Sequence, residues 1–201
     1  MAFMWIVCLA LASLASSYVS AEEGTIDCDF ESTDIYACGY TTDDAPYSQG
    51  TAYPWFRRAK YTWSSGTGPW LDHTLQTEEG HFIYLEASYR GEGFKGNLTS
   101  VEAKSSAEGS CLSFWYSMWG ADMGTLNAYT ASADPNGPLG EIRWTRSGPT
   151  EKNIWYPASF NIEPNMLFRL RFVGIVGKSH LSDMALDDIK MTDGLCESTE
   201  A

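Results

Sequence analysis

The clearest pattern along the chain is an alternation of two sets of residues from position 166 to position 172, in which Leu167, Arg169 and Arg171 form the second set. Every second position holds an apolar side chain: Met166, Phe168, Leu170 and Phe172. A period of two is that of a β-strand with one buried face. We therefore predict a strand here, with Arg169 and Arg171 on the opposite face, turned toward water.

Four further segments are short and rich in aromatic and β-branched residues, which favour strands. They are residues 81–87, 112–119, 125–131 and 141–145. Clusters rich in glycine, proline and polar residues lie between them, at 90–93, 133–138 and 146–149, and these clusters predict turns. No long segment shows the 3.6-residue period of a helix. Many short strands with few helices indicate an all-β sandwich or jelly roll.

The length and composition are those of a folded protein. The chain has 201 residues, of which 44% are hydrophobic, so a packed core is expected and global disorder is excluded. No linker, repeat or low-complexity segment interrupts Cys28 to Cys196, and a single domain is the simplest interpretation. The formal net charge of −13 disfavours binding to nucleic acid or to anionic lipid, because both carry negative charge.

Residues 1–21 have the character of a secretory signal peptide. Residues 3–15 are almost wholly apolar, and Val19-Ser20-Ala21 supplies small residues at the expected cleavage positions. The apolar run of about 13 residues is too short for a helix that crosses a bilayer. A retained anchor is the alternative, since no Lys or Arg precedes the run. We expect cleavage after Ala21, which makes the protein secreted and extracellular, with no insertion into the membrane.

The cysteines predict disulfides. Loss of Cys8 with the signal peptide leaves four of them, Cys28, Cys38, Cys111 and Cys196. An even number in an oxidising compartment predicts two bridges, although four cysteines allow three pairings and spacing alone does not choose among them. Metal binding by these cysteines is disfavoured, because the sequence has no C-x-x-C pair and no H-x-x-x-H spacing.

Several motifs follow one another in a fixed order from residue 27 to residue 197. They are Cys28-Asp29-Phe30-Glu31, Cys38-Gly39, tryptophans at 55 and 63, GPWLDHT at 68–74, GHFIYLE at 80–86, CLSFWYSM at 111–118, residues 172–177, MALDDI at 184–189, and Cys196. Each motif is weak evidence by itself. Together, in this order, they make the chain resemble the MAM domain, the module of meprin, A5/neuropilin and receptor phosphatase mu.

The resemblance implies an antiparallel two-sheet jelly roll over residues 27–197, with bridges Cys28–Cys38 and Cys111–Cys196. It also implies a non-enzymatic role in adhesion or protein interaction, with another extracellular protein or a second copy of the chain as partner. Two alternatives are kept. One is a lectin-like jelly roll that binds glycans, and the other is a structural component of the extracellular matrix.

The acidic residues near the first and last predicted strands suggest a cation site. In jelly rolls of the kind that the chain resembles, acids from these two strands can meet and hold a cation. Oxygen ligands from separate segments suit a hard ion such as Ca²⁺ better than Zn²⁺. We predict a structural Ca²⁺ site with Glu31, Asp72 and Asp187 as ligands and Asp188 nearby. The alternative is that these acids are solvated or bonded to turn amides.

One sequon occurs in the chain, Asn97-Leu98-Thr99, and its middle residue is not proline. Because it follows Gly96 at an expected surface edge of a secreted protein, we predict N-glycosylation of Asn97. The alternative is a buried or unused site.

Catalytic chemistry finds little support in the sequence. There is no G-x-S-x-G motif, the three histidines are scattered, and the cysteines are committed to bridges. We therefore predict a protein that is not an enzyme, with His73 as a structural hydrogen-bonding residue.

Seven tryptophans follow the signal peptide, and they allow two interpretations. A sugar-stacking platform or a protein-binding surface is one. We favour the other, a packed core, because aromatic side chains supply much of the buried area of a sandwich. On either interpretation, Trp144 and Trp155 are candidates to face each other across neighbouring strands.

Overall fold

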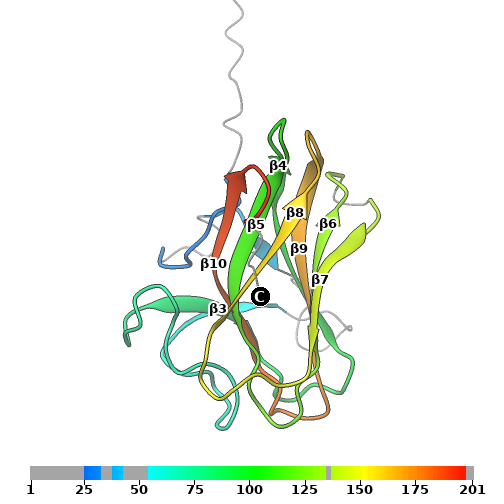
Figure 1. Cartoon of the computed structure of the whole chain (residues 1–201). Helices are drawn as coiled ribbons and strands as arrows, with labels where there is room; N and C mark the ends of the chain where they lie inside the picture. Colours follow the sequence, from blue (N-terminus) through cyan, green and yellow to red (C-terminus); the bar gives the residue numbers. More distant parts are fainter. Residues whose placement is uncertain (1–24, 33–37, 43–53, 135–136, 198–201) are drawn as a thin grey trace, which may run out of the picture.

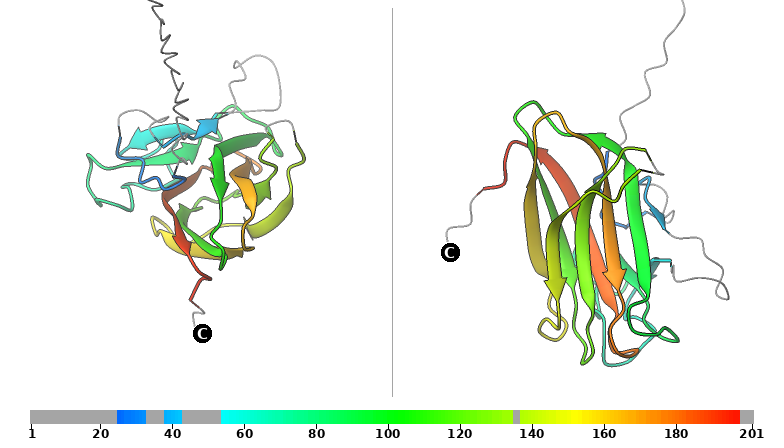
Figure 2. Two further views of the ribbon diagram at one scale, coloured as in Figure 1. Left: turned by 90° about the horizontal axis from the view of Figure 1, so that it is seen from above. Right: turned by 90° about the vertical axis from the view of Figure 1, so that its right-hand side faces the viewer.

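The structure is a computed structural model that describes residues 25–32, 38–42, 54–134 and 137–197, which form two five-stranded antiparallel sheets (Figure 1). The predicted signal peptide, residues 1–21, lies outside the described residues. Strand order is β1-β4-β9-β6-β7 in the first sheet and β2-β3-β10-β5-β8 in the second. Figure 2 shows the long strands running along the length of the molecule. This arrangement confirms the predicted all-β, two-sheet jelly-roll sandwich.

The strands include all five that the sequence predicts. The first sheet contains β1 (Thr41–Thr42), β4 (Lys95–Lys104), β9 (Leu167–Ile175), β6 (Thr125–Ala131) and β7 (Glu141–Ser147). The second contains β2 (Phe56–Ala59), β3 (His81–Leu85), β10 (Met184–Asp193), β5 (Ser110–Ser117) and β8 (Tyr156–Ile162). Strand β6 has its predicted bounds, whereas β3, β5, β7 and β9 have slightly shifted ends. Among the described residues, none forms a helix with the length and apolar character needed to span a membrane.

The core lies between the two sheets and is built by alternation. In β9, Phe168, Leu170 and Phe172 are fully buried, as the period of two predicts. The Phe172 ring meets the ring of Phe114 from β5 edge to face, with centroids 4.9 Å apart. Aromatic pairs of this geometry stabilise a core beyond the area that they bury.

The two arginines of β9 are less exposed than predicted. Arg169 donates from Nε to the Ala133 carbonyl and from Nη1 to the Ser100 carbonyl. Arg171 donates from Nε to Thr99 Oγ1. Long side chains on the outer face of a sheet can lie along it and bond to neighbouring strands, which leaves both arginines half-buried.

Two disulfides fix the ends of the domain and confirm the pairing that the resemblance implies. Cys28–Cys38 has its Cα atoms 5.6 Å apart, and Cys111–Cys196 has them 4.7 Å apart. The first bridge holds a segment that adds to β10 as an isolated bridge, because Cys28 and Ile189 exchange both backbone hydrogen bonds at 2.9 Å. The second bridge ties β5 to the residues that follow β10.

Candidate interaction site

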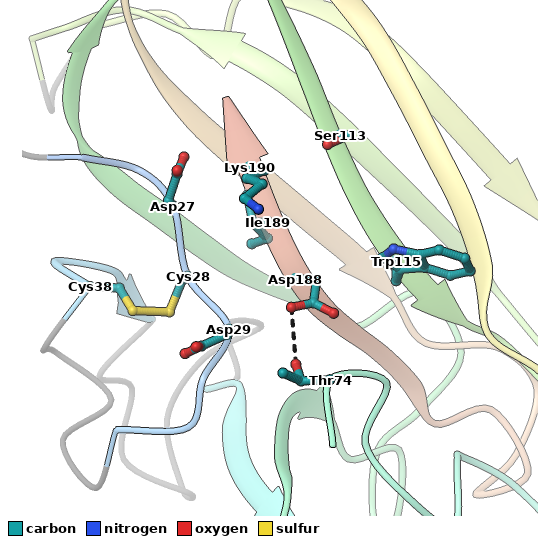
Figure 3. Close-up of a pocket in the computed structure, with 10 residues that line it drawn as sticks. All are labelled: Asp27, Cys28, Asp29, Cys38, Thr74, Ser113, Trp115, Asp188, Ile189 and Lys190. Atoms are coloured by element: carbon teal, nitrogen blue, oxygen red, sulfur yellow. Dashed lines mark hydrogen bonds between the residues drawn. A yellow bond between two sulfur atoms is a disulfide. The ribbon is translucent and has the colours of Figure 1, made fainter. Parts of the chain in front are cut away.

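A hollow of about 470 Å³ opens beside the first disulfide (Figure 3). We call it the acidic hollow. Its walls come from the segment around Cys28, from β5 and β10, and from the loop between β2 and β3. The lining residues are Asp27, Cys28, Asp29, Cys38, Thr74, Ser113, Trp115, Asp188, Ile189 and Lys190. This set contains three carboxylates and one ammonium group, so the hollow carries negative charge.

A bulge in β10 shapes the floor of the acidic hollow. Asp187 pairs with Trp115 of β5 and Lys190 pairs with Ser113, so two residues of β10 stand opposite one residue of β5. At the bulge Asp188 takes a positive φ of 45°. Because a bulge interrupts the alternation of a strand, the side chains of Asp187 and Asp188 both reach the loop residues at 73 and 74.

Asp187 lies behind the hollow and is fully buried. Its Oδ2 accepts the His73 backbone N–H at 2.8 Å, and its Oδ1 accepts the backbone N–H of Asp188 at 2.8 Å. The pKa of Asp187 is raised to about 8, chiefly by burial; the charges of Asp188 and Asp72 also raise it, and the two backbone hydrogen bonds lower it. Neutralisation of the buried carboxylate, by a proton or by a cation, is therefore favourable near neutral pH.

His73 connects Asp188 to the aromatic side of the hollow. Its Nδ1 lies 2.5 Å from Asp188 Oδ2, and its ring stacks on the Trp115 indole with centroids 3.7 Å apart. Thr74 Oγ1 donates to Asp188 Oδ1 at 3.0 Å, the bond drawn in Figure 3. These contacts confirm His73 as a structural hydrogen-bonding residue and fix the Asp188 carboxylate at the mouth of the hollow.

The three predicted cation ligands take different places. Asp72 is buried, and its carboxylate accepts the backbone N–H groups of Leu75 and Thr77. It lies close enough to Asp187 for its charge to raise the pKa of that residue. Glu31 accepts the His81 N–H at 2.8 Å.

All three carboxylates therefore accept hydrogen bonds from the backbone, which is the arrangement described by the alternative to a cation site. Within the described residues, no group of three or more His, Cys, Asp or Glu side chains is arranged to hold a metal ion. The assignment of Glu31, Asp72 and Asp187 as Ca²⁺ ligands stays a prediction.

Asn97 lies in β4 with its side chain on the outer, half-exposed face of the first sheet. Its neighbours Gly96 and Leu98 are buried, as the alternation requires. Glycosylation of Asn97 also stays a prediction.

The tryptophans are only partly in the core. Trp55 is buried, but Trp63 and Trp70 are about half exposed. The expectation that Trp144 and Trp155 face each other is wrong, because they belong to different layers. Trp144 of β7 packs on Phe114 between the sheets at 5.1 Å, whereas Trp155, next to β8, packs on Phe82 at 5.8 Å in a separate cluster.

Parts of the acidic hollow were missed by the sequence analysis. Asp27 and Asp29 flank Cys28 and were not singled out, and the bulge at Asp188 leaves no signature in the sequence. The sequence signal that could have identified these two acids is their position on either side of Cys28, which was predicted to form a disulfide. The disulfide and the bridge to Ile189 fix Cys28 beside β10, so Asp27 and Asp29 are held next to that strand.

Comparison with known proteins adds the family context. The family model described as "MAM domain, meprin/A5/mu" matches residues 28–197. The rat MAM domain-containing glycosylphosphatidylinositol anchor protein 1 is 34% identical over 174 residues, which are 84% of this chain and 17% of that protein. Human MAM domain-containing protein 2 is 32% identical over 166 residues, 81% of this chain and 23% of that protein. The chain thus spans less than a quarter of the length of these relatives.

A solved structure confirms the architecture at low sequence identity. The K1 cleaved adhesin domain of Lys-gingipain from Porphyromonas gingivalis W83 superposes with a TM-score of 0.57 at 15% identity. The match covers 85% of this chain and 98% of that domain. At this identity the likeness shows a shared fold.

Proposed function

The chain belongs to the MAM domain family, and from this premise we propose that it acts outside the cell as a non-enzymatic module that binds a protein partner through the acidic hollow. MAM domains are generally involved in adhesion or protein interaction. The observation that carries the proposal is the hollow itself, where Asp27, Asp29 and Asp188 surround a recess built on a disulfide and a bulged strand.

The charge of the hollow indicates the chemistry of the partner. Three carboxylates against the single ammonium group of Lys190 suit a basic segment of a protein. Two copies of a chain with a net charge of −13 repel each other, so we favour a different, basic partner over homophilic contact. The extracellular location rests on the predicted signal peptide and on the two disulfides, which form in oxidising compartments.

The test replaces the three carboxylates with amides. We expect the variant Asp27→Asn/Asp29→Asn/Asp188→Asn to lose binding of the labelled full chain to the surface of cells, because amides keep the hydrogen-bond acceptors and remove the charge. The matched control Glu92→Gln/Glu102→Gln/Glu108→Gln changes the net charge equally at exposed positions elsewhere. Equal binding of the two variants would contradict the proposal. Sedimentation over a concentration series tests the homophilic alternative, which predicts association that grows with concentration.

We also propose that Ca²⁺ binds at the Asp72–Asp187 pair, with Glu31 as the third acid. The support is the buried position of both aspartates and the raised pKa of Asp187. Carboxylate oxygens are the ligands that Ca²⁺ prefers, and a cation would offset the cost of the buried charges. The ion would stabilise the loop that supplies His73 and Thr74 to the acidic hollow.

A further inference from the structure

We propose that a second hollow, between the β2–β3 loop and the β7–β8 loop, binds an acidic saccharide, a sugar ring that carries a carboxylate. The hollow has a volume of about 610 Å³, within the range of small-molecule sites. We call it the tryptophan pocket. Six of its lining residues are Tyr61, Trp63, Trp70, Trp119, Lys152 and Asn153. Figure 1 shows the two loops at the same end of the molecule. The inference stands apart from the protein-binding function proposed for the acidic hollow.

Exposed aromatic rings gather at this pocket. Tyr61, Trp63 and Trp70 are 63%, 56% and 48% exposed. Large apolar side chains that gather at one exposed site mark an interaction site more often than chance. A pyranose ring presents C–H groups on one face and hydroxyl groups around its rim. An aromatic side chain stacks on the C–H face, and polar groups around it form hydrogen bonds with the hydroxyl groups.

Lys152 selects an acidic sugar over a neutral one. Its Nζ lies 4.9 Å from the centroid of the Trp70 ring and 5.6 Å from that of Trp119, where the ring faces attract the ammonium group. No ion pair of Lys152 occurs among the described residues, whereas Lys60 pairs with Glu78 at 3.0 Å. The Lys152 charge is therefore available to a carboxylate of the ligand. Glu78 also lines the pocket, but its carboxylate is paired with Lys60, so Lys152 leaves the lining with one net positive charge. Salt screens more distant negative charges beyond about 8 Å.

A buried donor in the pocket also lacks an acceptor. Trp119 is 9% exposed, and its indole Nε1–H has no hydrogen-bond partner in the described part of the chain. A buried N–H without an acceptor is unfavourable and rare in folded proteins. This nitrogen is itself closed to solvent, so the pocket would offer a saccharide the exposed rings and the Lys152 ammonium group, and not the Trp119 N–H.

Hydrogen bonds hold the walls of the pocket in place. The Trp70 backbone N–H donates to Asn153 Oδ1 at 2.8 Å, which joins the two loops. Thr67 Oγ1 donates to the Trp119 carbonyl at 3.0 Å. Gly68 has a positive φ of 69°, and a side chain there would collide with the side chain of Thr62. A preorganised pocket loses less conformational entropy on binding.

The first experiment compares acidic and neutral saccharides on the full chain. The probes are 3′-sialyllactose, its neutral parent lactose, and a hyaluronan tetrasaccharide that carries glucuronate. Calorimetry and tryptophan fluorescence report binding. We expect at least one acidic probe to bind with a Kd about tenfold or more below that of lactose, as one charge-assisted contact provides. The two acidic probes separate sialic acid from uronic acid as the source of the carboxylate. Absence of binding by both acidic probes, or equal binding of lactose, overturns the proposal.

The second experiment assigns the binding to the pocket. We expect Lys152→Gln to reduce the affinity for the acidic probe to that for lactose, and Trp70→Ala to abolish binding. Trp70→Tyr keeps an aromatic ring and should retain part of the affinity if Trp70→Ala disturbs the fold. Tyr89→Ala is the matched control, since Tyr89 is 99% exposed and lies outside the pocket. Unchanged affinity in Lys152→Gln overturns the proposal. A second result would also overturn it. If no saccharide binds and Trp70→Ala nevertheless loses binding to the cell surface, the pocket is a contact for a protein.

Discussion

The imidazole of His73 lies flat on the indole of Trp115, with ring centroids 3.7 Å apart and planes 17° apart. Trp115 belongs to β5, and His73 belongs to the loop between β2 and β3. The same imidazole approaches Asp188 on β10. One side chain thus connects the long loop to two adjacent strands of the second sheet.

We expect His73→Ala to destabilise the domain by about 1–3 kcal/mol, because it removes a ring stack and a hydrogen bond to a carboxylate. Urea unfolding followed by tryptophan fluorescence measures the change. His180→Ala is the control at an exposed position, with an expected change within about 0.5 kcal/mol. If both variants lose the same stability, the contacts of His73 with Trp115 and Asp188 do not stabilise the fold.

Asp183 makes stability depend on pH. Burial, followed by the charge of Glu86, raises its pKa from 3.8 to about 7. In the folded state it therefore binds a proton that the unfolded chain has already lost between pH 4 and pH 7. The contribution of Asp183 to the free energy of unfolding is fully present below about pH 4 and is lost as the pH rises through 7.

Asp183→Asn should remove this part of the pH dependence. We expect the variant to match the parent near pH 4 and to exceed it by up to about 4 kcal/mol at pH 8, since one pKa unit equals about 1.4 kcal/mol. Unfolding curves at several pH values measure the difference between variant and parent. Asp187, whose pKa is also raised, to about 8, likewise makes stability fall as the pH rises. This effect is present in both the variant and the parent, so it drops out of the difference between them. The exposed change Asp193→Asn is the control, and an equal slope in both variants would refute the assignment.

Calcium should raise the melting temperature. At tenfold excess over its Kd, a ligand of the folded state adds about 1.4 kcal/mol, or about 3–5 °C for a domain of this size. The measurement is thermal unfolding in millimolar Ca²⁺ against a chelator. Asp187→Asn and Asp72→Asn should each abolish the rise, while Asp193→Asn should keep it. No rise in the parent counts against the cation site.

Loss of the two disulfides should have unequal effects. By the loop-entropy relation, the Cys111–Cys196 bridge, with a separation of 85 residues, contributes about 4.6 kcal/mol. The Cys28–Cys38 bridge, with a separation of 10, contributes about 2.7 kcal/mol. Unfolding of the two double-serine variants gives both values. A larger loss from the shorter loop would show that contacts of the Cys28 segment with β10 outweigh chain entropy.

Asn97 should carry a glycan when the full chain is expressed in cells that glycosylate secreted proteins. Treatment with peptide-N-glycosidase should then increase electrophoretic mobility, and Asn97→Gln should show the treated mobility from the start. Because Asn97 lies on the outer face of β4, the variant should retain the melting temperature of the parent to within about 2 °C. Identical mobility of the untreated parent and the variant would show that the sequon is unused.

The strands were the most predictable part of the fold. Alternation in β9 reports a buried face directly, since each side chain faces the opposite side from its neighbour. Strand β6 was predicted instead from its aromatic and β-branched residues. Strand β1 has only two described residues, and β2 consists of Phe-Arg-Arg-Ala, so neither has a clear alternation. The pairing of cysteines followed from the resemblance and not from spacing, because a closed loop of any length can be bridged.

The sites were less predictable, because they depend on positions that no local pattern encodes. The bulge at Asp188 turns one more carboxylate toward the acidic hollow, and the sequence LDDI is equally compatible with a regular strand. Trp63 and Trp70 were expected in the core from their residue type. They are exposed because the loop that contains them is held by Thr67 and Asn153 across the end of the sandwich.

The Cys111–Cys196 bridge also determines how the domain responds to mechanical load. A pull applied at residue 197 passes through the covalent bond into β5, so β10 cannot be peeled away from its end one bond at a time. The force instead shears β10 and β5 together, and both lie inside the second sheet with a neighbouring strand on either side. A module loaded in this way resists tension better than one that unzips.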